Sequence, residues 1–393
     1  MIFLVNIYFI LSAKGLSMVQ FDRGKSVAFV LGSFYPAQEG GPDNTIYWLG
    51  KALVKSNFDV TVFSTSKGIN NSAMINIWNS LDGINVCYFS YFISHYFSIG
   101  LLISFWRKVR QYDIVHLTSI YYPLSMICAL ICIIRRVDFS ISPRGELDRG
   151  ASQYSSKLKM LYRSISIPIL SKSKYCIATS EQEKSDLFSV FGKNKEVRLL
   201  INYLDEYSFG HGTDKYKSCS GYMLYLGRIH PKKNIESLIS AFKMLPKDLT
   251  DVHPLYIAGT GNQSYVHELK CLSAGYNIKF IGKVTGLDKL SLYKNASLFI
   301  LPTHGENYGN VVAESLAQGT PVICSIYAPW KGLVVYECGY FIDNKPEDIL
   351  NSIVEFFSLS DEEKCIMGER ALCFAKSKLS TNGNEREIAN VFF

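Results

Sequence analysis

Short apolar runs alternate with amphipathic stretches along most of this chain, starting at Ser26. The apolar runs have the length and composition of buried parallel strands. Strands are predicted at residues 27–31, 60–63, 84–89, 114–117, 175–179, 197–201, 222–226, 255–258, 278–281 and 297–301. Helices are predicted at residues 44–55, 124–134, 311–318, 348–357 and 361–376. Regular alternation of the two elements predicts an α/β chain of doubly wound parallel sheets, and 393 residues are enough for two domains.

The richest candidate chemistry lies in residues 301–325. Here a predicted strand runs through a turn rich in Pro, Gly and Asn into a predicted helix. Free N–H groups and the helix dipole at such a start favour an anion. Glu306 lies in the turn and Glu314 about one turn into the helix, so the ligand should also carry hydroxyls. A nucleotide sugar has both features; the alternative is an ordinary strand–helix unit with two solvated glutamates.

Two cations follow the predicted strand at 222–226. Arg228 can grip a phosphate with its planar fork, and Lys233 can act as a point charge, so the pair can neutralise a diphosphate. The tight turn of Gly259 and Gly261 follows the strand at 255–258, although this spacing alone is weak evidence for a site.

Two motifs carry a resemblance to a known family. Residues 306–323 read ENYGNVVAESLAQGTPVI, with the two glutamates in the pattern E-x7-E, and residues 226–234 read LGRIHPKKN. Both resemble the donor-site signatures of retaining glycosyltransferases of family 4 (group 1), which have the GT-B fold. The resemblance extends in particular to bacterial enzymes that build O-antigen, capsule and exopolysaccharide.

The resemblance implies two Rossmann-like doubly wound domains that face each other across a cleft. The acceptor-binding domain would comprise residues 26–205 plus about 377–393, because the C-terminal helix crosses back to the first domain. Residues 206–376 would form the nucleotide-sugar-binding domain. Residues 1–25 would be an N-terminal extension, either a mis-assigned start or an anchor.

Site roles follow from the same resemblance. Arg228 and Lys233 would bind the donor diphosphate and act in catalysis, Glu306 would hold sugar hydroxyls beside the reacting carbon, and Glu314 would bind the ribose. Further donor-binding residues would be Asn307, Tyr308, Gly309, Asn310, Val311, Gly259, Gly261, Gly40 and Gly41.

Two residues of the first half are candidates for acceptor binding. His116 ends the sequence DIVH, which resembles the family's D-V-V-H, although Thr118 stands where many relatives have a second histidine. Arg144 lies in the sequence SPRG, similar to family members that extend surface polysaccharides, and is predicted to bind an acceptor phosphate. On the residues alone, a core histidine and a surface salt bridge are the alternatives.

The resemblance implies retaining transfer of a hexosyl unit from a nucleoside diphosphate sugar to a hydroxyl of a lipid-linked, polyprenyl-type glycan. A nucleotide-sugar epimerase of the same fold and a non-catalytic nucleotide-sugar or lipid-binding protein are the alternatives. The chain has no D-x-D triplet, so we expect neither a metal ion nor another cofactor.

Charge is distributed unevenly. Residues 1–200 contain 22 basic and 13 acidic residues, a balance of +9, whereas the remainder has a balance of −2. No interleaved aromatic and basic motif of an RNA-binding type occurs, so we expect no nucleic acid partner. Basic residues alternate with apolar ones over residues 157–174. This pattern suits an anionic membrane surface, and predicts a peripheral protein at the inner face of the plasma membrane.

The cysteines and the N-terminus bear on the compartment. Ten cysteines are scattered without a C-x2-C pair, which favours reduced thiols in a cytosolic protein. Residues 1–11 are almost wholly apolar but lack the preceding basic segment of a signal peptide, and they are too short to span a bilayer. Met18 is therefore a candidate initiator, with an interfacial anchor as the alternative.

Overall fold

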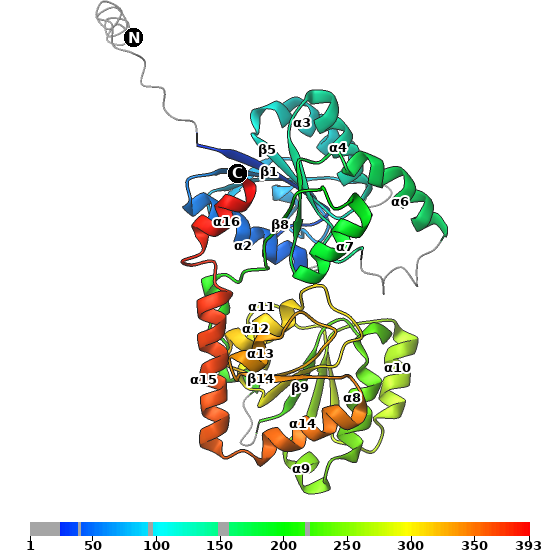
Figure 1. The fold of residues 1–393 in the computed structure, drawn as a ribbon, viewed down its shortest axis with the longest axis vertical. Coiled ribbons are helices and arrows are strands. Elements are labelled where there is room, and N and C mark those ends of the chain that lie inside the picture. Colours follow the sequence, from blue (N-terminus) through cyan, green and yellow to red (C-terminus); the bar gives the residue numbers. More distant parts are fainter. Residues whose placement is uncertain (1–23, 38–40, 93–96, 148–156, 217–220) are drawn as a thin grey trace, which may run out of the picture.

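The structure is a computed structural model that describes residues 24–37, 41–92, 97–147, 157–216 and 221–393. For Pro42 and residues 157–160 it describes the backbone only. Two α/β domains stack along the long axis of the molecule, the first from blue to green and the second from green to orange (Figure 1). Residues 1–23 of the predicted N-terminal extension, and Gly40, lie outside the described residues.

The first domain is built on an eight-stranded sheet in the order β3-β4-β2-β1-β5-β6-β7-β8. All neighbouring strands are parallel except β3 and β4, which form an antiparallel pair. The strands are β1 (Ser26–Leu31), β2 (Asp59–Thr65), β3 (Trp78–Leu81), β4 (Ile84–Phe89), β5 (Ile114–Thr118), β6 (Phe139–Ser142), β7 (Tyr175–Ala178) and β8 (Val197–Leu199). Their side chains are mostly buried on both faces, as expected for a parallel sheet covered by helices.

Helices cover both faces of this sheet and form two separate cores. One core includes residues of α3 (Ile99–Lys108), α4 (Pro123–Arg135), α6 (Lys157–Leu170) and α7 (Glu181–Phe191). The other includes residues of α2 (Gly41–Lys55) and of the C-terminal α16 (Glu385–Phe392). The alternation of strand and helix predicted from the hydrophobic pattern is confirmed.

The second domain has a six-stranded parallel sheet in the order β11-β10-β9-β12-β13-β14. Its strands are β9 (Met223–Leu226), β10 (Leu255–Ala258), β11 (Ile278–Gly282), β12 (Leu298–Leu301), β13 (Val322–Ser325) and β14 (Gly339–Ile342). Its helices are α8 (Ile235–Met244), α9 (Lys247–Val252), α10 (Gln263–Leu272), α11 (Gly286–Lys294), α12 (Asn310–Ala317), α13 (Gly332–Val335), α14 (Pro346–Ser358) and α15 (Asp361–Lys378). One continuous apolar core unites these elements.

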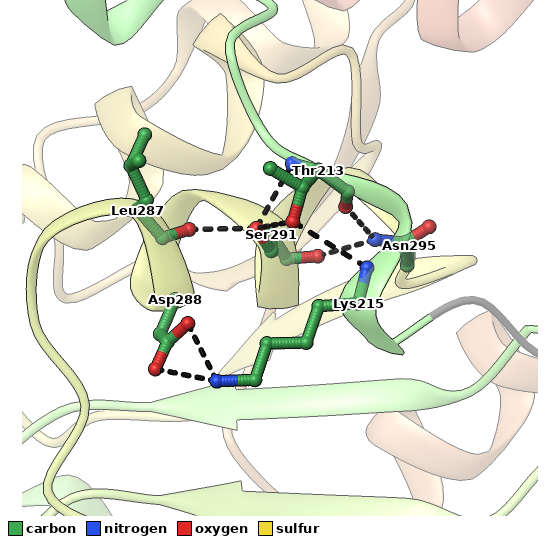
Figure 2. A network of polar contacts seen from close by, with 6 residues as sticks. All are labelled: Thr213, Lys215, Leu287, Asp288, Ser291 and Asn295. Carbon is green, nitrogen blue, oxygen red and sulfur yellow. Dashed lines mark hydrogen bonds and ion pairs between the residues drawn. The ribbon is translucent and has the colours of Figure 1, made fainter.

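The chain enters the second domain through a polar segment that is fastened to α11. Thr213 accepts a hydrogen bond from Asn295 Nδ2 at 2.7 Å through its carbonyl, and its N–H donates to Ser291 Oγ at 2.9 Å. Lys215 forms an ion pair with Asp288 of the same helix at 2.8 Å (Figure 2). These contacts fix the position of α11. The same helix carries Lys289 and Tyr293, which contact the predicted site residue Glu314.

The C-terminal segment crosses back to the first domain, as predicted. Helix α15 runs along the second domain and α16 packs on α2 of the first (Figure 1). Phe392 belongs to the apolar core of that domain, and its carbonyl accepts a hydrogen bond of 2.8 Å from Tyr175 Oη. None of the helices within the described residues combines the length and apolar character needed to cross a bilayer.

Candidate active site

A cavity of about 260 Å³ lies in the cleft between the two domains. The first domain and the segment leaving it contribute Gly41, Arg144 and Asn202. The second domain contributes Leu226, Gly227, Arg228, Lys233, Leu301, Glu306, Asn307, Tyr308, Gly309, Asn310 and Val311. The structure thus gathers most of the predicted site residues at one place, although 269 positions separate Gly41 from Asn310.

Sheet topology explains why the two donor motifs meet. Strands β9 and β12 are parallel neighbours, so their carboxyl ends lie at the same edge of the sheet. The loop after β9 carries Lys233 and the loop after β12 carries Glu306. Their side chains form an ion pair. The side chain of Lys233 is 14% exposed and that of Glu306 is 19% exposed, and both line the cavity.

The N-terminus of α12 opens on the cavity. Its N-cap residue, Gly309, has φ 85° and contributes no side-chain cap, so the first N–H groups of the helix are not covered by a capping side chain. A Cβ at Gly309 would lie 3.0 Å from Trp330 Nε1 and 3.1 Å from Glu306 Cγ. Trp330 in turn donates a hydrogen bond to the carbonyl of Tyr308. Glycine is therefore required here by both conformation and space.

Arg228 is the exposed cation of the site. Its carbonyl accepts a hydrogen bond of 2.9 Å from Tyr225 Oη, which fixes the backbone. Within the described residues, its guanidinium forms no ion pair with a carboxylate, unlike the Lys233 ammonium. Arg228, Lys233 and the start of α12 together make this part of the cavity electropositive, as an anionic group requires.

Two hydrogen-bonded links join the domains at the cavity. Asn307 Nδ2 donates to Thr179 Oγ1 at 2.7 Å, and Asn202 Nδ2 donates to Asn310 Oδ1 at 2.8 Å. Arg144 extends the second link, because its Nη1 lies 3.1 Å from Asn202 Oδ1. The segment from Asn307 to Asn310 is thus fastened to the first domain at both of its ends.

Arg144 has a φ of 52° and is held largely by internal partners. Besides Asn202, its Nη1 donates to Thr45 Oγ1 at 3.1 Å, while its buried Nε has no hydrogen-bond partner. Burial lowers the pKa of the guanidinium to about 10, and the Glu183 carboxylate opposes that shift. Glu183 also accepts hydrogen bonds from the N–H groups of Gly145 and Thr179 at 2.6 and 2.7 Å. Arg144 lines the cavity and also organises the loops of the first domain, and its contact with an acceptor phosphate stays a prediction.

Glu314 does not line the cavity. It is 7% exposed on α12, forms an ion pair with Lys289 at 2.7 Å, and accepts a hydrogen bond from Tyr293 Oη at 3.2 Å. Burial first, and the nearby carboxylate second, raise the pKa of the Tyr293 phenol well above its usual value, so Tyr293 is a neutral donor. Both partners lie on α11, and contact of Glu314 with a ribose stays a prediction.

Gly259 and Gly261 lie outside the cavity and have a packing role. A Cβ would lie 1.8 Å from the carbonyl oxygen of Gly227 at the first position and 1.9 Å from that of Ile229 at the second. The loop after β10 therefore packs directly against the backbone of the loop that carries Arg228. These glycines shape the site from behind, and a direct contact with the donor stays a prediction.

His116 is 1% exposed on β5 and does not line the cleft cavity. Its Nδ1 lies 2.9 Å from Ser140 Oγ, and its ring packs edge-on against Phe29 and Phe392. Burial, with a smaller effect of Arg144, lowers the pKa of the imidazole to about 3. This geometry is that of a neutral core histidine and offers no contact to an acceptor in the cleft.

Sequence reasoning missed Asn202 and Thr179, which supply the first domain's half of the two links. The sequence predicts no role in the site for Asn202, and it predicts Thr179 only as the last residue of a strand. The available signal was position, since each follows the carboxyl end of a strand at the sheet edge that faces the cleft.

Two Rossmann-like domains with a cavity between the carboxyl ends of their sheets form the arrangement known as the GT-B fold. A family model described as "Glycosyl transferases group 1" matches residues 216–371, and one described as "Glycosyltransferase Family 4" matches residues 39–205. The two models together match most of the chain, which belongs to the group 1 glycosyltransferases.

Individual relatives are distant. An uncharacterized glycosyltransferase of Methanocaldococcus jannaschii is 27% identical over 261 residues, which cover 61% of this chain and 64% of the relative. The O-antigen chain mannosyltransferase B of Escherichia coli is 28% identical over 159 residues, which cover 40% of this chain and 42% of the relative. The chain thus spans less than two thirds of the length of these curated relatives.

Solved structures share the fold over nearly the whole chain. Sucrose-phosphate synthase of Thermosynechococcus elongatus superposes with a TM-score of 0.73 at 16% identity, covering 94% of this chain and 98% of that one. Anabaena HepE, solved in complex with UDP-glucose, superposes with a TM-score of 0.71 at 15% identity, covering 93% and 99%. At these identities the likeness concerns the fold.

Proposed function

We propose that this protein transfers a hexosyl unit, with retention of configuration, from a nucleoside diphosphate sugar to a hydroxyl of a lipid-linked glycan. The observation that carries the proposal is the composition of the cleft cavity. Arg228, Lys233 and the start of α12 supply positive charge, and Glu306 stands beside them. A diphosphate attached to a sugar matches both parts of this surface.

The chemistry follows from where charge develops. Breaking the bond between sugar and phosphate builds negative charge on the leaving diphosphate, and positions that are already positive stabilise it without reorganisation. Arg228, Lys233 and the N–H groups near Asn310 and Val311 would provide this stabilisation. Neither a metal ion nor another cofactor is assigned a part in this step.

Glu306 would hold sugar hydroxyls next to the reacting carbon. Its ion pair with Lys233 links the group that binds the sugar to the group that binds the phosphate. Retention would then result from attack of the acceptor on the same face that the diphosphate leaves, with the leaving phosphate taking the acceptor proton.

The acceptor class rests on relatives rather than on the cavity. One relative is named as an O-antigen chain mannosyltransferase of Escherichia coli and another as a capsular polysaccharide biosynthesis glycosyltransferase of Staphylococcus aureus. Both names concern surface polysaccharides, which supports a glycan acceptor and a hexosyl donor for this chain.

The test is release of nucleoside diphosphate in the presence and absence of a lipid-linked glycan acceptor, with the anomeric configuration of the product read by NMR. We expect release that depends on acceptor, and a product with the configuration of the donor. Inversion would refute the retaining mechanism. Donor turnover to an epimer without acceptor would identify an epimerase, and donor binding without any turnover would identify a binding protein.

A further inference from the structure

Helices α3, α4 and α6 form one outer face of the first domain. They lie in that order over the same side of the sheet, since α4 contacts both α3 and α6 (Figure 1). Their inner sides pack into a common apolar core. The side turned away from the sheet, called the three-helix face below, has no partner within the described residues.

The three-helix face carries large apolar side chains in the exposed position. Ile134 is 63% exposed and Leu161 is 60% exposed. Others with more than a third of their surface exposed are Ile99, Ile103, Trp106, Leu130, Ile133 and Ile165. Outer faces of surface helices are ordinarily polar, so a row of this kind on three neighbouring helices indicates an interaction surface.

Charge on this face has one sign. The sequences of α3, α4 and α6 contain no Asp or Glu, whereas basic residues end α3 and α4 and lie in the first half of α6. The Arg135 guanidinium lies over the Trp106 ring at 5.0 Å, and Arg110 Nε donates to the Arg135 carbonyl at 3.4 Å. These contacts hold an aromatic ring and two arginines together where α3 and α4 end.

A groove of about 620 Å³ continues the face between the ends of α4 and α6. Its apolar lining includes Ile133 and Ile169, and its basic lining consists of Arg136, Lys172 and Lys174. Asp138, the acid that lines the groove, is neutralised by Lys174 at 2.6 Å. Arg136 and Lys172 therefore leave the groove positively charged.

We propose that the three-helix face docks on the surface of a bilayer that contains anionic phospholipid. Arg136 and Lys172 would hold a lipid phosphate at the groove, and the exposed apolar side chains would enter the boundary between headgroups and acyl chains. A second copy of this chain fits less well, because two such faces would bring like charges together. Nucleic acid would use the charges but not the apolar side chains.

This inference does not depend on the proposed reaction. It differs from the expectation drawn from residues 157–174 alone, because it includes α3, α4 and the groove. The side chains of Lys157 and Lys159, which contributed to that expectation, lie outside the described residues.

The test is flotation of the full chain with vesicles of phosphatidylcholine alone and with vesicles that also contain phosphatidylglycerol. We expect binding to the anionic vesicles only. Binding should be weaker in high salt, since the Debye length falls from about 10 Å at 0.1 M to about 3 Å at 1 M. The double variant Arg136→Gln with Lys172→Gln should bind roughly 25-fold more weakly, about fivefold for each charge. Ile134→Ser should weaken binding without changing the salt dependence.

Matched controls lie on the second domain. Val335 is 76% exposed and apolar, and Lys247 is exposed and basic, so Val335→Ser and Lys247→Gln should bind like the unaltered protein. Absence of binding to anionic vesicles at low salt would overturn the proposal. So would binding that the three-helix variants leave unchanged, or a dimer in solution that Ile134→Ser dissociates.

Discussion

The two sides of the cleft present arginine in different ways. Arg228 on the second domain is exposed and faces the cavity without a carboxylate partner among the described residues. Arg144 on the first domain lines the same cavity but is held by Thr45 and Asn202. A cation with no internal partner can be satisfied by a ligand, whereas one with internal partners already has a structural role. The comparison predicts where substitutions act on donor binding and where they act on the assembly of the cleft.

The largest effect is expected from Glu306→Gln, which keeps the shape of the side chain and removes its charge beside Lys233. Because positioned charge acts in the transition state, turnover should fall on the order of a hundredfold, with a much smaller loss of donor affinity. Turnover at saturating donor, combined with a separate measurement of donor dissociation, checks this prediction.

Glu314→Gln is the matched control, eight positions away on the same motif. It removes a carboxylate whose partners are Lys289 and Tyr293, so it should lower thermal stability. Because these contacts hold α12, whose first residues line the cavity, the variant should chiefly weaken donor binding rather than turnover. If both variants lowered turnover equally and left donor affinity unchanged, the assigned roles would be wrong.

Arg228→Ala and Lys233→Ala should each weaken donor binding by about 1.5–3 kcal/mol, or roughly tenfold to a hundredfold, through loss of a charge-assisted contact. Titration calorimetry with the nucleotide sugar measures the loss. Lys232→Ala is the control, because this neighbouring lysine does not line the cavity. Unchanged affinity in folded Arg228→Ala and Lys233→Ala would refute the donor site.

Substitution of His116 should change the stability of the protein rather than its catalytic activity. The pKa of His116 is about 3 in the folded protein, against about 6.5 when unfolded, so the unfolded chain takes up a proton first as the pH falls. The stabilisation is complete above pH 6.5 and is lost toward pH 3; by about pH 5.5 it should decrease by roughly 1.4 kcal/mol. His116→Asn should be less stable at neutral pH, but should lack this acid-dependent loss in denaturant titrations. An unaltered pH dependence would contradict the buried neutral imidazole.

Asn202→Ala should have the smallest effect. It removes the link from Arg144 to Asn310, and a net loss of about 0.5–1.5 kcal/mol corresponds to a roughly twofold to tenfold loss of donor affinity. Asn202→Asp tests the geometry further, because it keeps the acceptor for Arg144 and loses the amide donor for Asn310. Identical donor affinity in the unaltered protein and in both variants would argue that the link does not position α12.

The repeating units of the fold could be predicted because each is encoded locally. The apolar runs that form β1, β4 and β9 are flanked by turn residues. The helical pattern of α15 extends over a long segment, residues 361–378. Helix α2 begins at Gly41, three residues before the predicted start, because the apolar stripe appears only at Ile46. Pro42 and Asp43 are helix-start signals that the stripe does not contain.

The site could be predicted only as far as its own motifs extend. Arg228, Lys233 and Glu306 lie in two short segments with recognisable spacing. The links from Asn202 to Asn310 and from Asn307 to Thr179 join residues 108 and 128 positions apart, so they depend on how the domains face each other. Glu314 is a further case, since the spacing of the motif gives no sign of its partners Lys289 and Tyr293 on α11.

The most direct test of the central claim is a thermal-shift screen of nucleoside diphosphate sugars on the unaltered protein and on the double variant Arg228→Ala with Lys233→Ala. A ligand that binds the folded state at about 100 times its dissociation constant adds about 2.7 kcal/mol of stability. The account predicts that at least one nucleotide sugar raises the melting temperature of the unaltered protein by several degrees, and that the double variant loses most of this shift. An equal shift in both proteins, or no shift with any nucleotide sugar, would contradict it.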